Sequence, residues 1–340
     1  MTRQFAATRA SGEVYALGEG PVWDPVRQRL LWVDINAGAV HEGRLDPETG
    51  TITATAAHTF GAAGNTAGTA AGTAAGNTAG NTAGNTAGTT AGTTADDTAG
   101  TTAGTTAGNT VGAVAVSADG QLVVAEREVL TRVDAAGRRT ELARVLPPGA
   151  PSRLNDGAVD PAGRFLIGSM ALDDREGQEV LARLDGTDCV LLDEDLTLSN
   201  GLAWSPEGDR LYSIDSTPHV VWERDYDPAT GRTGPRRELF RLTGGMPDGM
   251  CADAEGNLWI AFFGGGRVEC RDPGGRLLAV VEVGTPNVTC PAFAGPDLDV
   301  LVITTSTNDV DVAEHPGSGH LFTARVGVRG LATPYWAPPR

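Results

Sequence analysis

The chain has 340 residues and a formal net charge of −17. Nucleic acids and anionic membrane surfaces bind clustered Lys and Arg side chains, and no such cluster stands out, so neither partner is expected. The N-terminal stretch MTRQFAATRA lacks an apolar signal region, and no segment approaches the ~18 apolar residues of a membrane span. The four cysteines show no CxxC spacing, which is typical of buried free thiols in a reducing compartment. We therefore expect a soluble, cytoplasmic protein.

The first part of the chain contains a turn at Asp24, an apolar run LLWVD, and then a low-complexity segment over residues 63–110. That segment repeats tetrads such as AGNT, AGTT and AGTA. A period of four fits neither strand alternation nor a helical stripe, and these residues offer little surface to bury. We expect a flexible insertion. Because it ends beside Gly112, at the predicted rim that carries Glu19, a lid over a substrate is an alternative, and a stacked solenoid is another.

Turns like that at Asp24 recur along the rest of the chain at intervals in the mid-forties, once the tetrad segment is subtracted. They begin at Asp24, Ser117, Asp160, Ser205, Asp253 and near Gly295. A second set of turns falls between them, at Asp46, Asp134, Asp227 and Asp272. The intervening runs are short, rich in Val, Leu, Trp and Phe, and without a 3.6-residue period. This pattern predicts an all-β fold, a single six-bladed β-propeller of four-stranded antiparallel blades over residues 1–340. An ordinary β-sandwich is the alternative.

Four polar residues each lie five positions before one of these inner turns, namely Glu19, Asn155, Asn200 and Asp248. In a propeller this position opens the inner strand of a blade, so the four side chains would ring one mouth of the central channel. Gly112 and Pro291 hold the corresponding places in the second and sixth units. Oxygen ligands of this kind suit Ca²⁺ or Mg²⁺, and carboxylates also hold Zn²⁺ or Mn²⁺. An isolated Asn-Gly or Asp-Gly is usually only a turn, but four such residues in register predict a shared metal site.

Several longer motifs lie around these residues. They are EGPVWDP, LLWVDI, SRLNDGAVDPAGRFLIGSM, SNGLAWSPEGDRLYSIDS, PDGMCADAEGNLWIAFFGGGRV and AFAGPDLDVLVITT. In these motifs the chain resembles the SMP-30/gluconolactonase/regucalcin-like family of six-bladed propeller lactonases. The resemblance covers essentially everything except the tetrads, and it is specific only when the motifs are taken together.

The resemblance implies one divalent cation held by Glu19, Asn200 and Asp248, whose identity among Ca²⁺, Zn²⁺, Mg²⁺ and Mn²⁺ stays open. The family's substrate contacts carry over to Arg153 and Asn155, and the acidic residue after its GSM motif carries over to Asp173, beside Asp174. In the chemistry such a site permits, a cation stabilises negative charge on an ester carbonyl oxygen. Asp248 is our candidate catalytic base, and an Arg fork suits several substrate oxygens.

The expected function is therefore hydrolysis of a sugar lactone, such as glucono-, xylono- or arabinolactone, to the aldonic acid. The sequence shows no GxSxG nucleophile motif and no HExxH metal motif that would favour another hydrolase. An esterase or phosphotriesterase using the same metal is one alternative. A non-enzymatic Ca²⁺-binding propeller is another, although a pure ion site would not need Arg153 and Asn155. The sequence gives no sign of an obligate protein partner.

Overall fold

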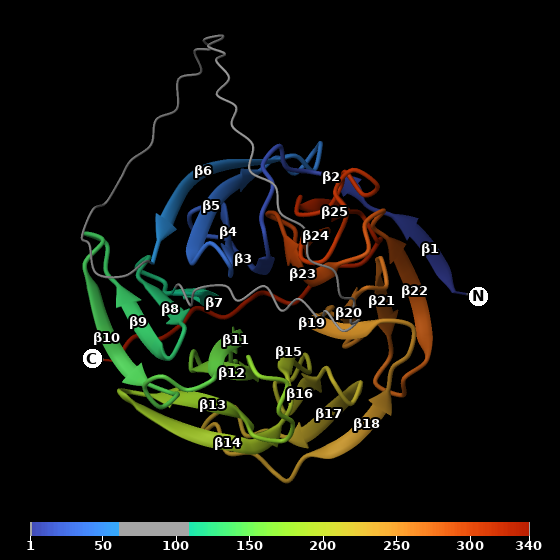
Figure 1. Cartoon of the computed structure of the whole chain (residues 1–340). Coiled ribbons are helices and arrows are strands. Elements are labelled where there is room, and N and C mark those ends of the chain that lie inside the picture. The colour runs from blue at the N-terminus through green and yellow to red at the C-terminus, as the bar shows by residue number, and fades with distance from the viewer. Residues whose placement is uncertain (1, 61–108, 340) are drawn as a thin grey trace, which may run out of the picture.

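The computed structural model describes residues 2–60 and 109–339, which form strands and turns arranged as a ring of six sheets (Figure 1). The predicted all-β, six-bladed propeller is confirmed. Within the described residues no helix is long and apolar enough to span a membrane. Residues 61–108, which hold nearly all of the tetrad segment 63–110, lie outside the described residues, so its nature stays a prediction.

The first four blades each use four strands that follow one another in the chain, from the central channel outward, and the last two blades begin in the same way (Figure 1). The inner strands are β3 (Gly18–Asp24), β7 (Val111–Val116), β11 (Ser152–Val159), β15 (Ser199–Trp204), β19 (Met246–Ala252) and β23 (Val288–Ala294). The second strands are β4 (Arg29–Asp34), β8 (Leu122–Glu126), β12 (Phe165–Ala171), β16 (Arg210–Asp215), β20 (Leu258–Phe263) and β24 (Val300–Thr305). The third strands are β5 (Ala39–Leu45), β9 (Val129–Val133), β13 (Glu179–Asp185), β17 (Val220–Asp225), β21 (Arg267–Arg271) and β25 (Phe322–Ala324). The fourth strands are β6 (Ile52–Thr59), β10 (Arg139–Arg144), β14 (Asp188–Leu196), β18 (Arg237–Arg241) and β22 (Leu277–Glu282).

The start of the chain closes the ring. Strand β2 (Thr8–Arg9) pairs antiparallel with β25 and completes the sixth blade. Strand β1 (Arg3–Ala6) pairs in parallel with β22, so the fifth blade has five strands rather than the four we expected. The extra strand arises because the chain runs along the edge of the fifth blade before it crosses to the sixth. The first strands therefore link the last two blades.

Apolar side chains fill the spaces between neighbouring blades. Each of the six junctions has its own buried cluster, for example Val33 and Val124 between the first two blades. Both faces of an inner strand are thus covered, and every residue of β7 and of β15 is buried. Trp32 and Trp259 belong to two of these clusters and have no exposed surface. Packing between blades positions the strands around the channel.

The turns after the inner strands carry buried carboxylates with structural roles. The Asp160 carboxylate accepts hydrogen bonds from the Tyr226 hydroxyl at 2.6 Å and from the backbone N–H of Arg164 at 2.8 Å. Asp253 in the same way accepts from the indole N–H of Trp259 at 3.0 Å. These two carboxylates fix the turns that end β11 and β19, at the opposite end of each strand from the predicted site.

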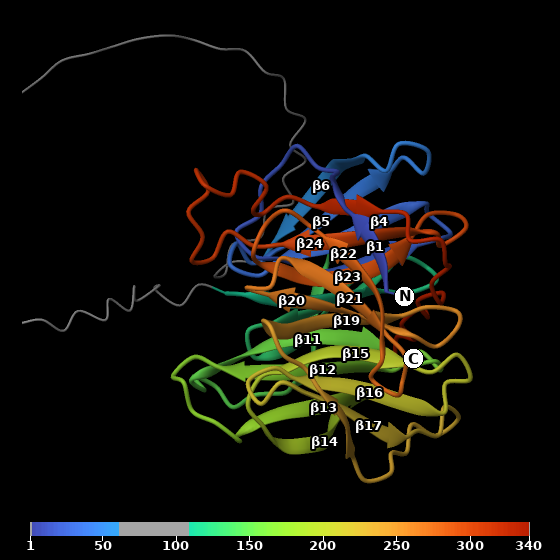
Figure 2. The ribbon, with the colours of Figure 1, turned by 90° about the vertical axis from the view of Figure 1, so that its right-hand side faces the viewer.

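The C-terminal segment crosses this far end of the channel. Gly330 bridges to Asp253 of the fifth blade, and Trp336 bridges to Ser117 of the second. In Figure 1 the red trace accordingly passes from the side of β23 past β7. Figure 2 shows the ring from its side, with the loop between β24 and β25 projecting on the face away from the C-terminus. The segment joins blades that are not neighbours.

We predict that Trp336→Ala destabilises the protein, because Trp336 is 2% exposed and packs into the cluster between the second and third blades. Truncating a buried aromatic side chain costs about 3–5 kcal/mol, which thermal or urea denaturation would measure. The control is Val26→Ala, at a side chain that is 68% exposed. Equal melting temperatures for the two variants would contradict a stabilising role for the C-terminal segment.

Candidate active site

Every inner strand has a break in its pairing near its first residues. The register shifts between Glu19 and Val22 in β3, between Leu154 and Gly157 in β11, and between Asn200 and Leu202 in β15. Strands β7, β19 and β23 shift at the equivalent place. At such a bulge an extra residue opposes one residue of the partner, so strict side-chain alternation is lost and side chains are re-aimed. The predicted polar residues therefore lie at or inside a bulge repeated in all six blades.

The predicted ligands Glu19 and Asp248 lie in one electrostatic environment. Glu19 is 6% exposed, and its pKa is raised well above the usual range because the carboxyl is buried and close to the charges of Asp248 and Asp156. Burial likewise raises the pKa of Asp248, and the charge of Asp156 adds to the effect. Like charges this close disfavour each other's ionisation. The structure thus brings the first and fifth blades' carboxylates together.

Asp156 is a site residue that the sequence reasoning did not single out. Burial raises its pKa to about 6, and its charge acts on both Glu19 and Asp248. The backbone N–H of Gly157 donates to its Oδ1 at 2.7 Å. The feature of the sequence that could have indicated Asp156 is its position directly after Asn155, because a bulge can turn a neighbouring side chain inward. The five-residue offset alone could not reveal it.

Arg153 is the cation of this cluster. Arg153 is 8% exposed, and burial lowers the pKa of its guanidinium to about 10, while the nearby carboxylates of Glu19 and Asp248 act in the opposite direction. Nη1 donates to the Leu154 carbonyl at 3.1 Å and to Asn155 Oδ1 at 2.7 Å. Three carboxyl groups and one guanidinium therefore share a small, poorly solvated volume. The carboxyl groups of Glu19, Asp156 and Asp248 thus outnumber the single guanidinium near them.

The two predicted amides are joined directly. Asn155 Nδ2 donates to Asn200 Oδ1 at 2.7 Å and to the Ser199 carbonyl at 2.9 Å. Asn200 Nδ2 in turn donates to the Ser216 hydroxyl at 2.9 Å. Asn155 and Asn200 are 6% and 5% exposed, so these bonds replace lost hydration. A hydrogen-bonded chain thus runs from Arg153 through both amides.

Asp173 lies apart from this chain of bonds. It belongs to the loop between β12 and β13, its side chain is 47% exposed, and its carboxylate pairs with Arg175 at 3.4 Å. Arg175 also donates to Glu179, a buried carboxylate that accepts from the Ser152 hydroxyl beside Arg153. The loop of Asp173 is therefore tied to strand β11. Substrate contact by Asp173 stays a prediction.

The second blade contributes a glycine because its strand approaches β11 closely. A Cβ atom at Gly112 would lie 2.3 Å from the Asn155 carbonyl oxygen and 2.5 Å from that of Leu154.

In the sixth blade, Cys290 directly precedes Pro291, the residue that the sequence pattern placed at the start of the inner strand, and Cys290 lies five residues before Gly295. Its buried thiol has a raised pKa, through burial and then the charges of Glu19 and Asp156. The sixth blade therefore places a thiol beside the carboxylates.

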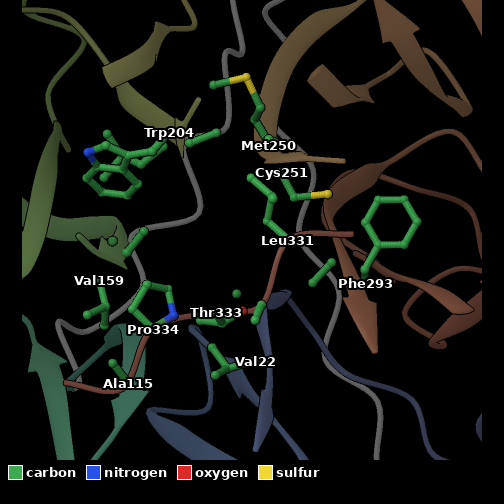
Figure 3. Close-up of a pocket in the computed structure, with 18 of the residues that line it drawn as sticks. Val22, Ala115, Val159, Trp204, Met250, Cys251, Phe293, Leu331, Thr333 and Pro334 are labelled. Carbon is green, nitrogen blue, oxygen red and sulfur yellow. The ribbon is translucent and has the colours of Figure 1, made fainter. Parts of the chain in front are cut away.

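A cavity of about 330 Å³ lies in the channel beyond these residues. Figure 3 shows its wall of apolar side chains, including Val22, Val159 and Phe293, with Leu331 and Pro334 of the C-terminal segment among them. Asp156 is the one acidic site residue that also lines it, whereas Glu19, Asn200 and Asp248 do not. The polar cluster and the apolar cavity thus adjoin each other in one channel, and Asp156 belongs to both.

Within residues 2–60 and 109–339, no three His, Cys, Asp or Glu side chains form a metal-binding group by themselves. The predicted ligand set needs only two carboxylates, since its third oxygen comes from the amide of Asn200. An oxygen-only set of this kind suits a hard divalent cation. The donors present are therefore compatible with such an ion.

A known family model, described as the SMP-30/Gluconolactonase/LRE-like region, matches residues 17–307. The chain belongs to this family. The match includes Glu19 at one end and reaches past Cys290 at the other, so it contains every residue of the cluster described above.

Individual relatives agree with this assignment. The chain is 33% identical to a 6-deoxy-6-sulfogluconolactonase of Pseudomonas putida over 94% of this chain and 95% of the relative. It is 31% identical to a pentonolactonase of Haloferax volcanii over 96% of each chain. Among solved structures, a calcium-binding regucalcin of Agrobacterium tumefaciens superposes with a TM-score of 0.79 at 25% identity, covering 99% of each chain.

We predict that Gly112→Ala lowers stability, because the added methyl group would press on the backbone of β11 at Leu154 and Asn155. Overpacking of this kind costs about 1–3 kcal/mol. The matched control is Gly12→Ala, where a Cβ would meet nothing within 4 Å. Thermal denaturation of both variants tests the claim. A Gly112→Ala protein as stable as Gly12→Ala would show that the two strands do not need this close approach.

Proposed function

We propose that this protein hydrolyses a sugar lactone to its aldonic acid with the help of one divalent cation. The observation that carries the proposal is the convergence of Glu19, Asn200 and Asp248 with Arg153 at one mouth of the channel. Two relatives that align over nearly the whole chain are lactonases by name, one of a sulfogluconolactone and one of pentonolactones. An aldonolactone with five or six carbons is therefore the substrate class that we favour.

The cation is supported by the chemistry of the donors. Glu19 and Asp248 are buried carboxylates whose negative charge Arg153 balances only in part, and Asn200 offers a neutral oxygen. The regucalcin with a similar fold is titled a calcium-binding protein. When bound, a divalent ion would polarise the lactone carbonyl and make a water molecule more acidic. Its identity among Ca²⁺, Zn²⁺, Mg²⁺ and Mn²⁺ is left to experiment.

The protein's own side chains supply orientation and proton transfer. We assign Asp248 as the general base that accepts the proton of the attacking water, because a carboxylate that binds a cation through one oxygen keeps a second oxygen that can accept a proton. Arg153 has further N–H donors and would bind the ring oxygen of the lactone, and Asn155 Oδ1, which accepts one bond from Arg153, would accept a second from a lactone hydroxyl group. Asp173, on the loop after β12, would accept from an outer hydroxyl.

The experiment is removal of metal with a chelator, followed by addition of Ca²⁺, Mg²⁺, Mn²⁺ and Zn²⁺ one at a time. Acid release is followed for a panel of five- and six-carbon aldonolactones, with an aryl ester and a phosphotriester alongside. We expect chelation to abolish lactone hydrolysis and at least one ion to restore it. Ion-dependent turnover of only the ester or phosphotriester would favour the esterase alternative. Ion binding with no hydrolysis at all would favour a calcium-binding propeller.

We predict that Asp248→Asn lowers kcat about 10²–10⁴-fold, the usual contribution of a general base. The amide keeps the shape of the side chain, so the melting temperature should change little. The control is Asp272→Asn in the same blade, at an outer turn where the carboxylate accepts from the Arg276 backbone at 2.9 Å. Steady-state kinetics on the best lactone would compare them. A kcat for Asp248→Asn within twofold of the control would exclude the proposed base.

A further inference from the structure

The side chain of Ser216 lies between two of the proposed ligands without being one of them. Ser216 follows β16 and is fully buried. Its hydroxyl donates to the carbonyl of Pro247 at 2.6 Å and accepts from Asn200 Nδ2 at 2.9 Å. Pro247 directly precedes Asp248 in β19. One hydroxyl therefore contacts the Asn200 side chain in the fourth blade and the backbone next to Asp248 in the fifth.

The backbone of Ser216 is itself held in place on both sides. Its N–H donates to the Leu198 carbonyl at 3.0 Å, and its carbonyl accepts from the N–H of His219 at 3.0 Å. The carboxylate of the preceding Asp215 accepts from the Leu198 N–H at 2.9 Å. The hydroxyl is thus presented from a fixed turn rather than from a mobile loop.

These bonds determine which way the Asn200 amide points. A backbone carbonyl can only accept, so the single proton of the Ser216 hydroxyl goes to Pro247 and its oxygen is left as an acceptor. The amide nitrogen of Asn200 must then face Ser216, and the amide oxygen must face the site. Asn155 is oriented by the same logic, because its Nδ2 donates to the Ser199 carbonyl and to Asn200 Oδ1.

We infer that Ser216 is a positioning residue, which presents the oxygen of Asn200 to the divalent cation and fixes its separation from Asp248. The inference rests on the proposed function, since it presumes that Asn200 is a ligand. Without the hydroxyl, the buried Asn200 Nδ2 loses its partner, only the bond from Asn155 Nδ2 to Asn200 Oδ1 still orients the amide, and a rotation that turns its N–H groups toward the site becomes easier. An N–H group cannot ligate a cation. Partners that orient metal ligands typically account for 10–100-fold in metal affinity.

The test is the affinity of metal-free protein for Mn²⁺, Zn²⁺ and Ca²⁺, each added alone and followed by isothermal titration calorimetry. We expect Ser216→Ala to weaken binding of the best ion about 10–100-fold. Ser216→Thr keeps the hydroxyl and should bind within about threefold of the unmodified protein. The matched control is Ser205→Ala in the same blade at the far end of the channel. Its hydroxyl likewise donates once, to Asp209 at 2.9 Å, and accepts once, from the Arg210 N–H at 3.1 Å.

The outcomes separate this inference from the proposed function. Unmodified protein that binds none of the ions would overturn the metal site and this inference with it. Unmodified protein that binds an ion while Ser216→Ala binds it equally well would overturn the role of Ser216 alone. If Ser216→Ala does not fold, Ser216→Cys is used instead, because a thiol keeps the approximate shape but forms weaker hydrogen bonds. We expect Ser216→Cys to bind the ion more weakly than Ser205→Ala does, and an affinity equal to that of Ser205→Ala would overturn the inference.

Discussion

Burial of apolar side chains between neighbouring blades is the constraint on which the rest of the structure depends. Each blade is covered on both faces by its neighbours, so six separate clusters hold the ring rather than one central core. No blade can bury its faces alone, and the ring must close for the first and last blades to do so. Strand β2 provides that closure in the sixth blade. The channel is what remains at the centre of this packing.

The polar cluster carries a free-energy cost that the packing has to offset. Glu19, Asp156 and Asp248 are held away from bulk water and near one another, with Arg153 as the cation among them. Burying charges without full compensation is unfavourable, and such arrangements are concentrated at functional sites. The repeated bulge explains how they are held, because it re-aims side chains where each inner strand opens. The packing of the ring therefore stabilises a cluster of buried ionisable groups that would be unfavourable by itself.

The sequence was enough to predict the propeller because turns with a constant period reflect a constant structural unit. The five-residue offset also selected Glu19, Asn155, Asn200 and Asp248, which lie at or inside equivalent bulges. It could not select Asp156 or Ser216, because the importance of each depends on residues of other blades. The parallel pairing of β1 was equally unpredictable, because a strand of four residues carries no signal for a partner strand near the other end of the chain.

The central claim is that Glu19, Asn200 and Asp248 hold one divalent cation at the mouth of the channel. Crystals grown with Mn²⁺ or Zn²⁺ would test it through an anomalous difference map recorded at the absorption edge of the ion. The account predicts a single strong peak about 2.0–2.2 Å from oxygens of these three side chains, the usual range for such ions. A peak elsewhere in the channel, or none in crystals whose protein binds the ion in solution, would contradict it.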